Sequence, residues 1–458
     1  MALFRSIKPK ETYRAWFKTV LQCAYPSHDA KAIQVEIVND QYLESSTKAS
    51  TRQKRGESSR RVHIESVEQK MPQGKNWQES FHNDANKEDL IRMAAEFFRS
   101  AEGRKLLTIP LIITCREEAW EISKSKVEVL SRCNHEEADT RMILHANSKD
   151  TPVVVVAKDT DVFVLLVHAM QKCKPTNEWF MFIDKEKFVK IRNIVEKFGS
   201  KVCCVLPQIH AMTGCDTTAY KYNVGKVKVM KKLARSEQQC TLIQDIGRDE
   251  SISQQVMVDA KTFVQTALYD GKPHESHVET RIRIYQNLTT KSSAAVPADP
   301  KSITEELQRV NLTCFIWLRC LDATVTRPDP KSCGWRYDEN LKRLMPKWFT
   351  GKQLPPSLTK STKSAKRKGK TSSQAQGNEA DGDDEISDNE RHAPSAKRSR
   401  PVTRKRLELP VREATYSADS EAQSNTDVGN VLSTSEWEKD FTTSEEEMSD
   451  SSDSDYLP

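Results

Sequence analysis

The sequence predicts an α/β fold that is followed by a disordered tail. Three observations support this prediction: short apolar runs of strand length, segments between them with apolar residues at helical spacing, and a sharp change in composition after Pro356. Strands that alternate with helices are typical of layered α/β domains. Hydrophobic residues make up 37% of the chain, and no apolar run approaches the ~20 residues that a membrane span requires. The composition therefore excludes a membrane-spanning protein.

Strand and helix signals follow one another along the first part of the chain. Ala32–Val38 and Thr108–Thr114 have the composition of strands, and Lys87–Arg99 has apolar residues at helical spacing. Glu136–Ala146 is predicted to be a helix with a partial apolar face. The valine run Val153–Ala157 is typical of a strand that is buried on both faces of a parallel sheet. We therefore expect a mainly parallel sheet with helices packed against it.

Residues 357–458 are rich in Ser, Thr, Lys, Asp and Glu and poor in large apolar side chains. Such a segment cannot bury enough apolar surface to offset its ordering entropy, so we expect it to be disordered. Its two basic clusters, Lys363–Lys370 and Lys397–Arg406, are typical of a bipartite nuclear-import signal. They predict a nuclear location and a nuclear import receptor as a partner.

The chain has 11 cysteines, and none of them forms a C-x-x-C motif. The scattered pattern indicates reduced, mostly buried thiols rather than a disulfide framework or a zinc site. Cys215 lies beside Asp216 and near His210 in the sequence, which raises the alternative of a cysteine nucleophile. A small buried thiol in a turn is the expected role of Cys215.

Three groups of acidic residues lie where the predicted fold would place its chemistry. They are Glu136, Glu137 and Asp139 at the start of a predicted helix, Asp159 and Asp161 after the valine run, and Asp216 in a Thr-Gly-Cys-Asp-Thr-Thr turn. The second group, Asp159 and Asp161, follows the carboxyl end of a predicted strand, where open α/β sheets bind their ligands. Converging carboxylates repel one another unless a divalent cation compensates their charge, and Mg²⁺ prefers oxygen ligands. Two such ions, ~4 Å apart, can stabilise both oxygens in phosphodiester cleavage. Taken singly, the glutamates could instead complement the helix dipole and Asp159 could be an N-cap.

The order and spacing of these groups resemble the flap-endonuclease superfamily of PIN-like 5′ nucleases. That family has a Glu-x-Glu pair on a helix, then an Asp-x-Asp at a strand end, then a Gly-x-Asp that opens a helix–two-turn–helix element. The matching segments are Glu137-Ala138-Asp139, Asp159-Thr160-Asp161 and Gly214-Cys215-Asp216. The phrases Glu-Glu-Ala-Asp-Thr-Arg, Asp-Thr-Asp-Val and Thr-Gly-Cys-Asp-Thr-Thr also resemble an uncharacterised group of metazoan proteins, some of which are linked to mobile elements.

The resemblance implies a PIN-like three-layer domain over residues 32–350, after an atypical N-terminal segment, 1–31. Within it, the resemblance implies a basic arch-like segment at 45–61 and a carboxylate core at 136–232. The implied ligands of one or two Mg²⁺ or Mn²⁺ ions are Asp40, Glu137, Asp139, Asp159, Asp161 and Asp216.

The resemblance also implies catalytic and nucleic-acid-binding roles. Asp159 and Asp161 would be catalytic, together with Lys48 and Arg52, which would orient the scissile strand. The bound nucleic acid is expected to be DNA. Its implied contacts are Arg55, Arg60 and Arg61 of the arch-like segment, and Gly225, Lys226, Lys228, Lys231 and Lys232 of a glycine turn and the helix after it.

The sequence lacks one metal ligand of the family, and two functions are therefore compatible with it. The family has a further metal-binding Asp on its first strand, but the residues before Asp40 contain only the acids Glu11, Asp29 and Glu36, none at the end of a convincing strand. Either the chain is truncated or the site has lost a ligand and the sheet a strand. The first function is a nuclear nuclease that hydrolyses phosphodiester bonds in structured or single-stranded DNA by a two-metal mechanism. The second is an inactive PIN-like scaffold, derived from a mobile element, that binds nucleic acid or protein.

A third class is an RNase-H-like transposase, which also has scattered carboxylates on an α/β sheet. It fits less well, because its first Asp is expected inside an early strand, whereas the acids here follow a helix start, a strand end and a glycine turn.

Overall fold

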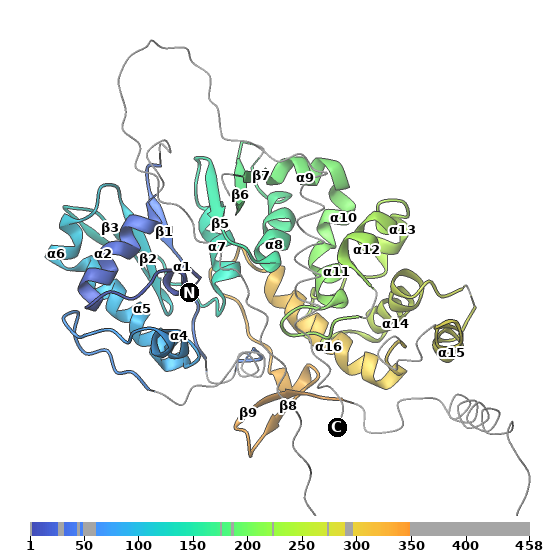
Figure 1. Ribbon diagram of the computed structural model, residues 1–458. Helices are drawn as coiled ribbons and strands as arrows, with labels where there is room; N and C mark the ends of the chain where they lie inside the picture. Colours follow the sequence, from blue (N-terminus) through green and yellow to red (C-terminus); the bar gives the residue numbers. More distant parts are fainter. Residues whose placement is uncertain are drawn as a thin grey trace, which may run out of the picture. The chain divides into compact units, whose positions relative to one another are not determined.

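The computed structural model describes residues 2–348, apart from 26–31, 44–45, 49–60, 175, 185–186, 222–223, 273 and 289–295. The described residues belong to one compact unit, and their helices and small sheets confirm the mixed α/β class (Figure 1). The predicted tail, 357–458, lies outside them. No helix in the described ranges has both the length and the apolar character needed to cross a bilayer.

The first sheet has four strands, in the order β1 (Val35–Ile37), β2 (Leu111–Cys115), β3 (Glu118–Ile122) and β4 (Val127–Val129). β1 is parallel to β2, and the other two pairings are antiparallel. Every residue of β2 is buried, because β2 lies in the interior of the sheet and packs against helices.

In the described part of the N-terminal region, five helices accompany this sheet. They are α1 (Ala2–Ser6), α2 (Tyr13–Ala24), α4 (Lys75–Ser80), α5 (Asp84–Arg99) and α6 (Ala101–Lys105). The apolar faces of α2 and α5 share one core with β2, and Phe17 of α2 stacks on Phe97 of α5 at 5.4 Å between ring centroids. The beginning of the chain is therefore part of the core of this sheet.

The second sheet has the order β5 (Val153–Val156), β6 (Trp179–Asp184) and β7 (Lys187–Lys190). β5 is parallel to β6, whereas β6 and β7 are antiparallel. The described strands thus form separate small sheets, in which only β1–β2 and β5–β6 are parallel pairs, rather than one mainly parallel sheet.

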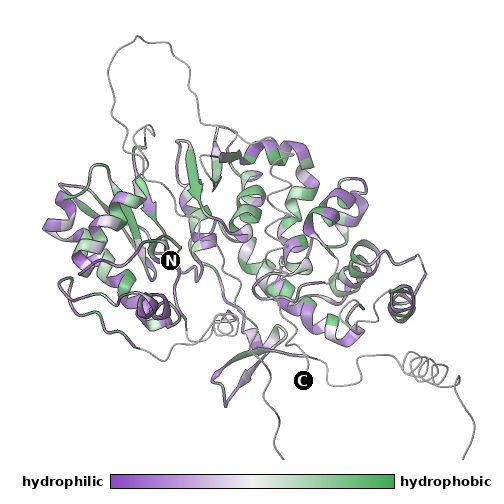
Figure 2. Cartoon of the chain, viewed as in Figure 1, coloured by the Kyte–Doolittle hydropathy of each residue, from purple (hydrophilic) through white to green (hydrophobic). Residues whose placement is uncertain are grey.

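The prediction that the valine run is buried on both faces is wrong. Val155 is buried, but the exposed fractions of Val154 and Val156 are 49% and 72%. β5 is at the edge of its sheet, and only its Val155 face packs into the core. The helix after it, α8 (Thr160–Met170), is buried from Asp161 to Met170 and is mostly hydrophobic in Figure 2.

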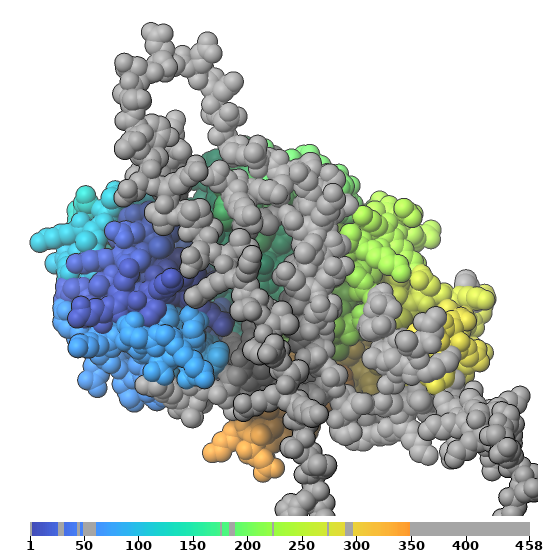
Figure 3. All heavy atoms as spheres, in the orientation of Figure 1, coloured from blue at the N-terminus to red at the C-terminus, as the bar shows by residue number. Residues whose placement is uncertain are grey.

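The remaining helices follow, and most of them contribute buried side chains to the core that Val155 enters. They are α7 (Ala138–Asn147), α9 (Ile191–Phe198), α10 (Ser200–Cys204), α11 (Leu206–Thr213), α12 (Lys226–Leu233), α13 (Gln238–Thr241), α14 (Gln254–Phe263), η1 (Val264–Leu268), α15 (His277–Asn287) and α16 (Pro300–Trp317). A short turn, η3 (Pro330–Ser332), leads to the hairpin β8 (Trp335–Asp338) and β9 (Arg343–Pro346), which is orange in Figure 3.

The hairpin is attached to α16 by a close backbone approach. Gly334 has φ +79°, and a Cβ there would lie 2.3 Å from the carbonyl oxygen of Glu305. The guanidinium of Arg309 donates to the carbonyls of Gly334 and Lys347, both at 2.9 Å. Gly334 is thus required for this packing.

Candidate functional site

Two helix starts and one turn present the predicted acids to one another. Glu137 is the N-cap residue of α7. Asp159 caps α8, since its Oδ1 accepts the backbone N–H of Asp161 at 2.9 Å, and Asp161 lies in the first turn. Asp216 lies in the turn after α11. Carboxylates at helix N-termini are favoured by the positive end of the helix dipole, which offsets part of their repulsion.

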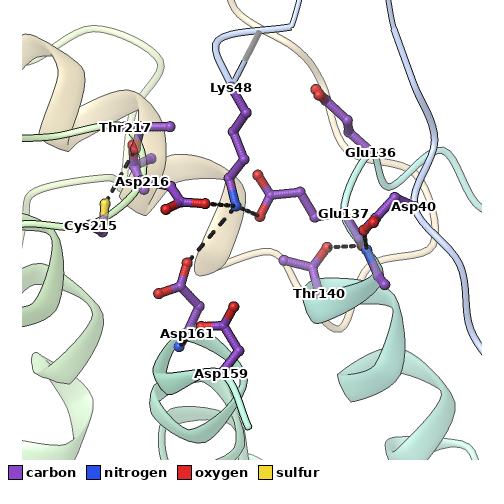
Figure 4. A network of polar contacts seen from close by, with 12 residues as sticks. Asp40, Lys48, Glu136, Glu137, Thr140, Asp159, Asp161, Cys215, Asp216 and Thr217 are labelled. Atoms are coloured by element: carbon purple, nitrogen blue, oxygen red, sulfur yellow. Dashed lines mark hydrogen bonds and ion pairs between the residues drawn. The ribbon is translucent and has the colours of Figure 1, made fainter. Parts of the chain in front are cut away.

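The ammonium group of Lys48 lies at the centre of these acids (Figure 4). Its Nζ is 3.0 Å from Glu137 Oε2, 3.6 Å from Asp216 Oδ2 and 3.9 Å from Asp161 Oδ2. The Lys48 side chain is 13% exposed and that of Asp161 is 8% exposed. Carboxylates from α7, α8 and the turn after α11 therefore meet at one point, across residues that are far apart in the sequence. We call Lys48, Glu137, Asp139, Asp159, Asp161 and Asp216 the acidic cluster.

The pKa values indicate an excess of negative charge in the acidic cluster. Burial raises the pKa of Glu137 to about 7, although Lys48 opposes the shift. Burial and neighbouring carboxylates also raise the pKa of Asp139 well above its ordinary value. The pKa of Asp159 is raised in the same way, although part of its side chain reaches solvent. One ammonium does not neutralise these groups.

Asp161 differs from its neighbours because it has a histidine partner. Its carboxylate Oδ1 lies 2.7 Å from Nε2 of His210 on α11, and the histidine side chain is 2% exposed. Although burial opposes the shift, this hydrogen bond helps to lower the pKa of Asp161 to about 2. Trp317 of α16 packs against the imidazole, with 5.5 Å between ring centroids. Asp161 is thus held ionised and in a fixed orientation.

Asp40 has a different neighbour from the other predicted ligands. Its Oδ1 accepts the backbone N–H of Ala138 at 2.9 Å, which supports the first turn of α7. In Figure 4 it lies near Glu136 and away from Lys48. The Ser46 hydroxyl donates to the Glu136 carboxylate. Through these two contacts, Asp40 and Ser46 are attached to the start of α7.

Arg141, the last residue of the Glu-Glu-Ala-Asp-Thr-Arg motif, has a structural role. The guanidinium is fully buried and donates to the carbonyls of Arg116, Glu117 and Glu118, at 3.0 Å for the last. It therefore connects α7 to the turn between β2 and β3.

The Thr-Gly-Cys-Asp-Thr-Thr turn is fixed by its own side chains. Gly214 has φ +121°, and a Cβ there would lie 2.6 Å from Cα of Tyr220. The Thr218 hydroxyl donates to the Ala211 carbonyl at 2.6 Å. Cys215 is buried, and burial raises the pKa of its thiol. These features support a structural role for Cys215 in positioning Asp216.

The predicted nucleic-acid contacts are in different environments. Arg55 and Arg60 lie outside the described residues, as does Arg52, for which a catalytic role is predicted. Arg61 forms an ion pair with Asp89 of α5 at 2.6 Å. Gly225 is the N-cap residue of α12. Lys226 is buried, with its ammonium 5.3 Å from the centre of the Tyr220 ring.

The lysines further along α12 differ in their exposure and contacts. Lys228 and Lys231 are exposed. Lys232 instead donates to the carbonyls of Thr266 and Ala267, at 2.9 and 3.0 Å, and pairs with Asp270 at 2.5 Å. Because their side chains are exposed, Lys228 and Lys231 are the α12 lysines that phosphate can reach from solvent.

The side chains of the acidic cluster are of the chemical type that binds a hard divalent cation. The acids offer only oxygen donors, their pKa values are raised by burial and mutual repulsion, and added positive charge would relieve both effects. Within the described part of the chain, no three His, Cys, Asp or Glu side chains already have the spacing of a metal site. Lys48 lies between the carboxylates instead.

Comparisons with protein-family models, curated proteins and solved structures find no match. Sequence reasoning missed His210 as a partner of Asp161; its only signal was its position on the helix just before the Gly-Cys-Asp turn.

Proposed function

We propose that this chain is a metal-dependent nuclease-like hydrolase that cleaves phosphodiester bonds in nucleic acid. The observation that carries the proposal is the convergence of carboxylates from three separate segments on Lys48. A structural ion pair needs one acid for one base, whereas the ammonium of Lys48 is within 4 Å of three carboxylates. Such an excess of buried acid is costly unless further positive charge is bound.

Each acid of the acidic cluster has a role in this proposal. Glu137, Asp139, Asp159, Asp161 and Asp216 would hold Mg²⁺ or Mn²⁺, and the bound ion would supply positive charge to activate water and stabilise phosphate oxygens. Asp40 supports α7 and so positions Glu137. Lys228 and Lys231 on α12 contact the nucleic-acid backbone, for which DNA is our expectation. The order of the acids along the chain supports a PIN-like, flap-endonuclease-like architecture.

The second candidate function is a scaffold that binds nucleic acid or protein without cleaving it. The position of Lys48 favours it, because an ammonium group already compensates part of the acidic charge. Glu36, an acid before Asp40, pairs with His145 of α7 at 2.6 Å and with Lys149, just after that helix, at 2.7 Å. It therefore does not supply the additional ligand that the resemblance implies.

We further propose that the protein acts in the nucleus and is carried there by an import receptor. The support is the sequence alone: Lys363–Lys370 and Lys397–Arg406 lie outside the described residues.

The test is cleavage of 5′-flap and single-stranded DNA by the full-length protein with Mn²⁺. We expect Asp159→Ala to abolish cleavage, while Asp150→Asn, which changes an acid with an 85% exposed side chain, leaves it unchanged. Undiminished cleavage by Asp159→Ala would rule out these roles. Calorimetric titration with Mn²⁺ distinguishes the two candidate functions. If the protein does not bind Mn²⁺, the hydrolase is excluded and the scaffold function remains.

A further inference from the structure

The ammonium of Lys48 lies where a bound divalent ion would have to lie. Its Nζ is within 4 Å of oxygens from Glu137, Asp161 and Asp216. Mg²⁺ binds oxygen ligands at ~2.1 Å, so an ion shared by these carboxylates would occupy the volume around Nζ. The ammonium and the ion cannot both be there.

The backbone at Lys48 is held separately from its ammonium. The Ser46 hydroxyl donates to Glu136, and the backbone N–H of Lys48 donates to Ser46 Oγ at 3.1 Å. Ser46 itself is 1% exposed. Between this anchor and Nζ lies a flexible four-carbon stem. The side chain can therefore withdraw by rotation while the backbone stays attached to the start of α7.

The electrostatics support an exchange of one cation for another. Burial opposes ionisation of Lys48, but the charges of Glu137 and Asp161 raise its pKa well above the ordinary value, so the ammonium remains charged. A divalent ion carries twice this charge and contacts oxygen directly, so it would compensate the carboxylates better.

We infer that Lys48 is an internal counter-ion, which keeps the acidic cluster assembled without metal and is displaced when a divalent ion binds. The inference rests on the proposed function, because it assumes that the acids bind such an ion. It adds a regulatory consequence: metal binding and the inward position of Lys48 are mutually exclusive, so each weakens the other by the same factor.

The first test compares Mn²⁺ affinity in the full-length wild type, Lys48→Met and Lys48→Arg. Removal of the competing cation is expected to tighten Mn²⁺ binding about tenfold in Lys48→Met, whereas Lys48→Arg stays near wild type. Lys126→Met, which changes an exposed lysine, is the matched control. Equal or weaker binding by folded Lys48→Met overturns the inference while leaving the proposed function intact. If neither wild type nor Lys48→Met binds Mn²⁺, the proposed function and this inference both fail.

The second test uses the wild-type chain alone and so does not depend on the folding of a variant. Mass spectrometry measures the acetylation rate of each lysine with and without Mn²⁺. We expect Mn²⁺ to accelerate acetylation of Lys48 several-fold and to leave exposed Lys126 unchanged. An unchanged or slower rate at Lys48, under conditions where calorimetry detects Mn²⁺ binding, overturns the displacement.

Discussion

Nε2 of His210 lies 2.7 Å from Oδ1 of Asp161, and both side chains are almost completely buried. The carboxylate accepts the hydrogen bond, so the proton is on Nε2 of the imidazole. This contact joins α11 to the first turn of α8 and fixes one acid of the acidic cluster.

His210 is expected to act through Asp161. His210→Leu removes the donor and should weaken Mn²⁺ binding about 10- to 100-fold, because groups that orient metal ligands commonly contribute that much. His210→Gln can donate from a similar position and should retain most of the affinity. Calorimetric titration of both variants checks this prediction, and equal loss in the two would indicate a role in packing alone.

The stability of the chain should depend on pH through Glu137. Its pKa is about 7 in the folded chain against 4.5 ordinarily, so the folded state binds the proton more tightly. The stabilisation from this proton is complete below pH 4.5 and is lost as the pH rises through about 7. Glu137→Gln should therefore gain up to about 3 kcal/mol relative to wild type across this range.

Urea unfolding of wild type and Glu137→Gln between pH 4.5 and 8 measures this difference, with exposed Glu196→Gln as the control. Saturating Mn²⁺ should remove the trend, because a bound cation favours the charged carboxylate. A difference that is independent of pH would contradict the prediction.

Arg141 is expected to be structural. Arg141→Met leaves three carbonyls of the β2–β3 turn without their donor and should lower the free energy of unfolding by about 3 kcal/mol or more. The matched control is Arg132→Met, since the Arg132 side chain is 73% exposed. Urea unfolding measures both, and similar small losses would show that the buried contacts contribute little.

Gly214 is expected to tolerate substitution less well than Gly199. Both have positive φ, so alanine is strained at either position. Only at Gly214 would the new Cβ meet backbone, 2.6 Å from Cα of Tyr220, while at Gly199 nothing lies within 4 Å. Gly214→Ala should therefore lower the midpoint of thermal unfolding more than Gly199→Ala. Equal shifts would show that the turn adjusts without cost.

Periodic patterns predicted two of the helices, because one apolar face is sufficient to define a helix. The helix expected at Lys87–Arg99 is observed as Asp84–Arg99, and that at Glu136–Ala146 as Ala138–Asn147. The valine run predicted a strand but not its surroundings. Four valines do not reveal whether a neighbour covers the second face of β5, and here Val156 is exposed.

The acids of the site could be predicted from the sequence, but the groups that pair with them could not. Glu137, Asp161 and Asp216 follow helix and turn signals and meet around Lys48. The partnership of Asp161 with His210, 49 positions away, depends on how α8 packs against α11, which local patterns do not encode.

The central claim is that the acidic cluster binds a divalent ion. Anomalous diffraction from crystals of the full-length protein grown with Mn²⁺ tests it most directly. The account predicts an anomalous peak within bonding distance of Asp161 and at least one of Glu137 and Asp216, with the Lys48 ammonium moved away. The claim would be contradicted if, at saturating Mn²⁺, Lys48 still lay between these carboxylates and no anomalous peak appeared beside them.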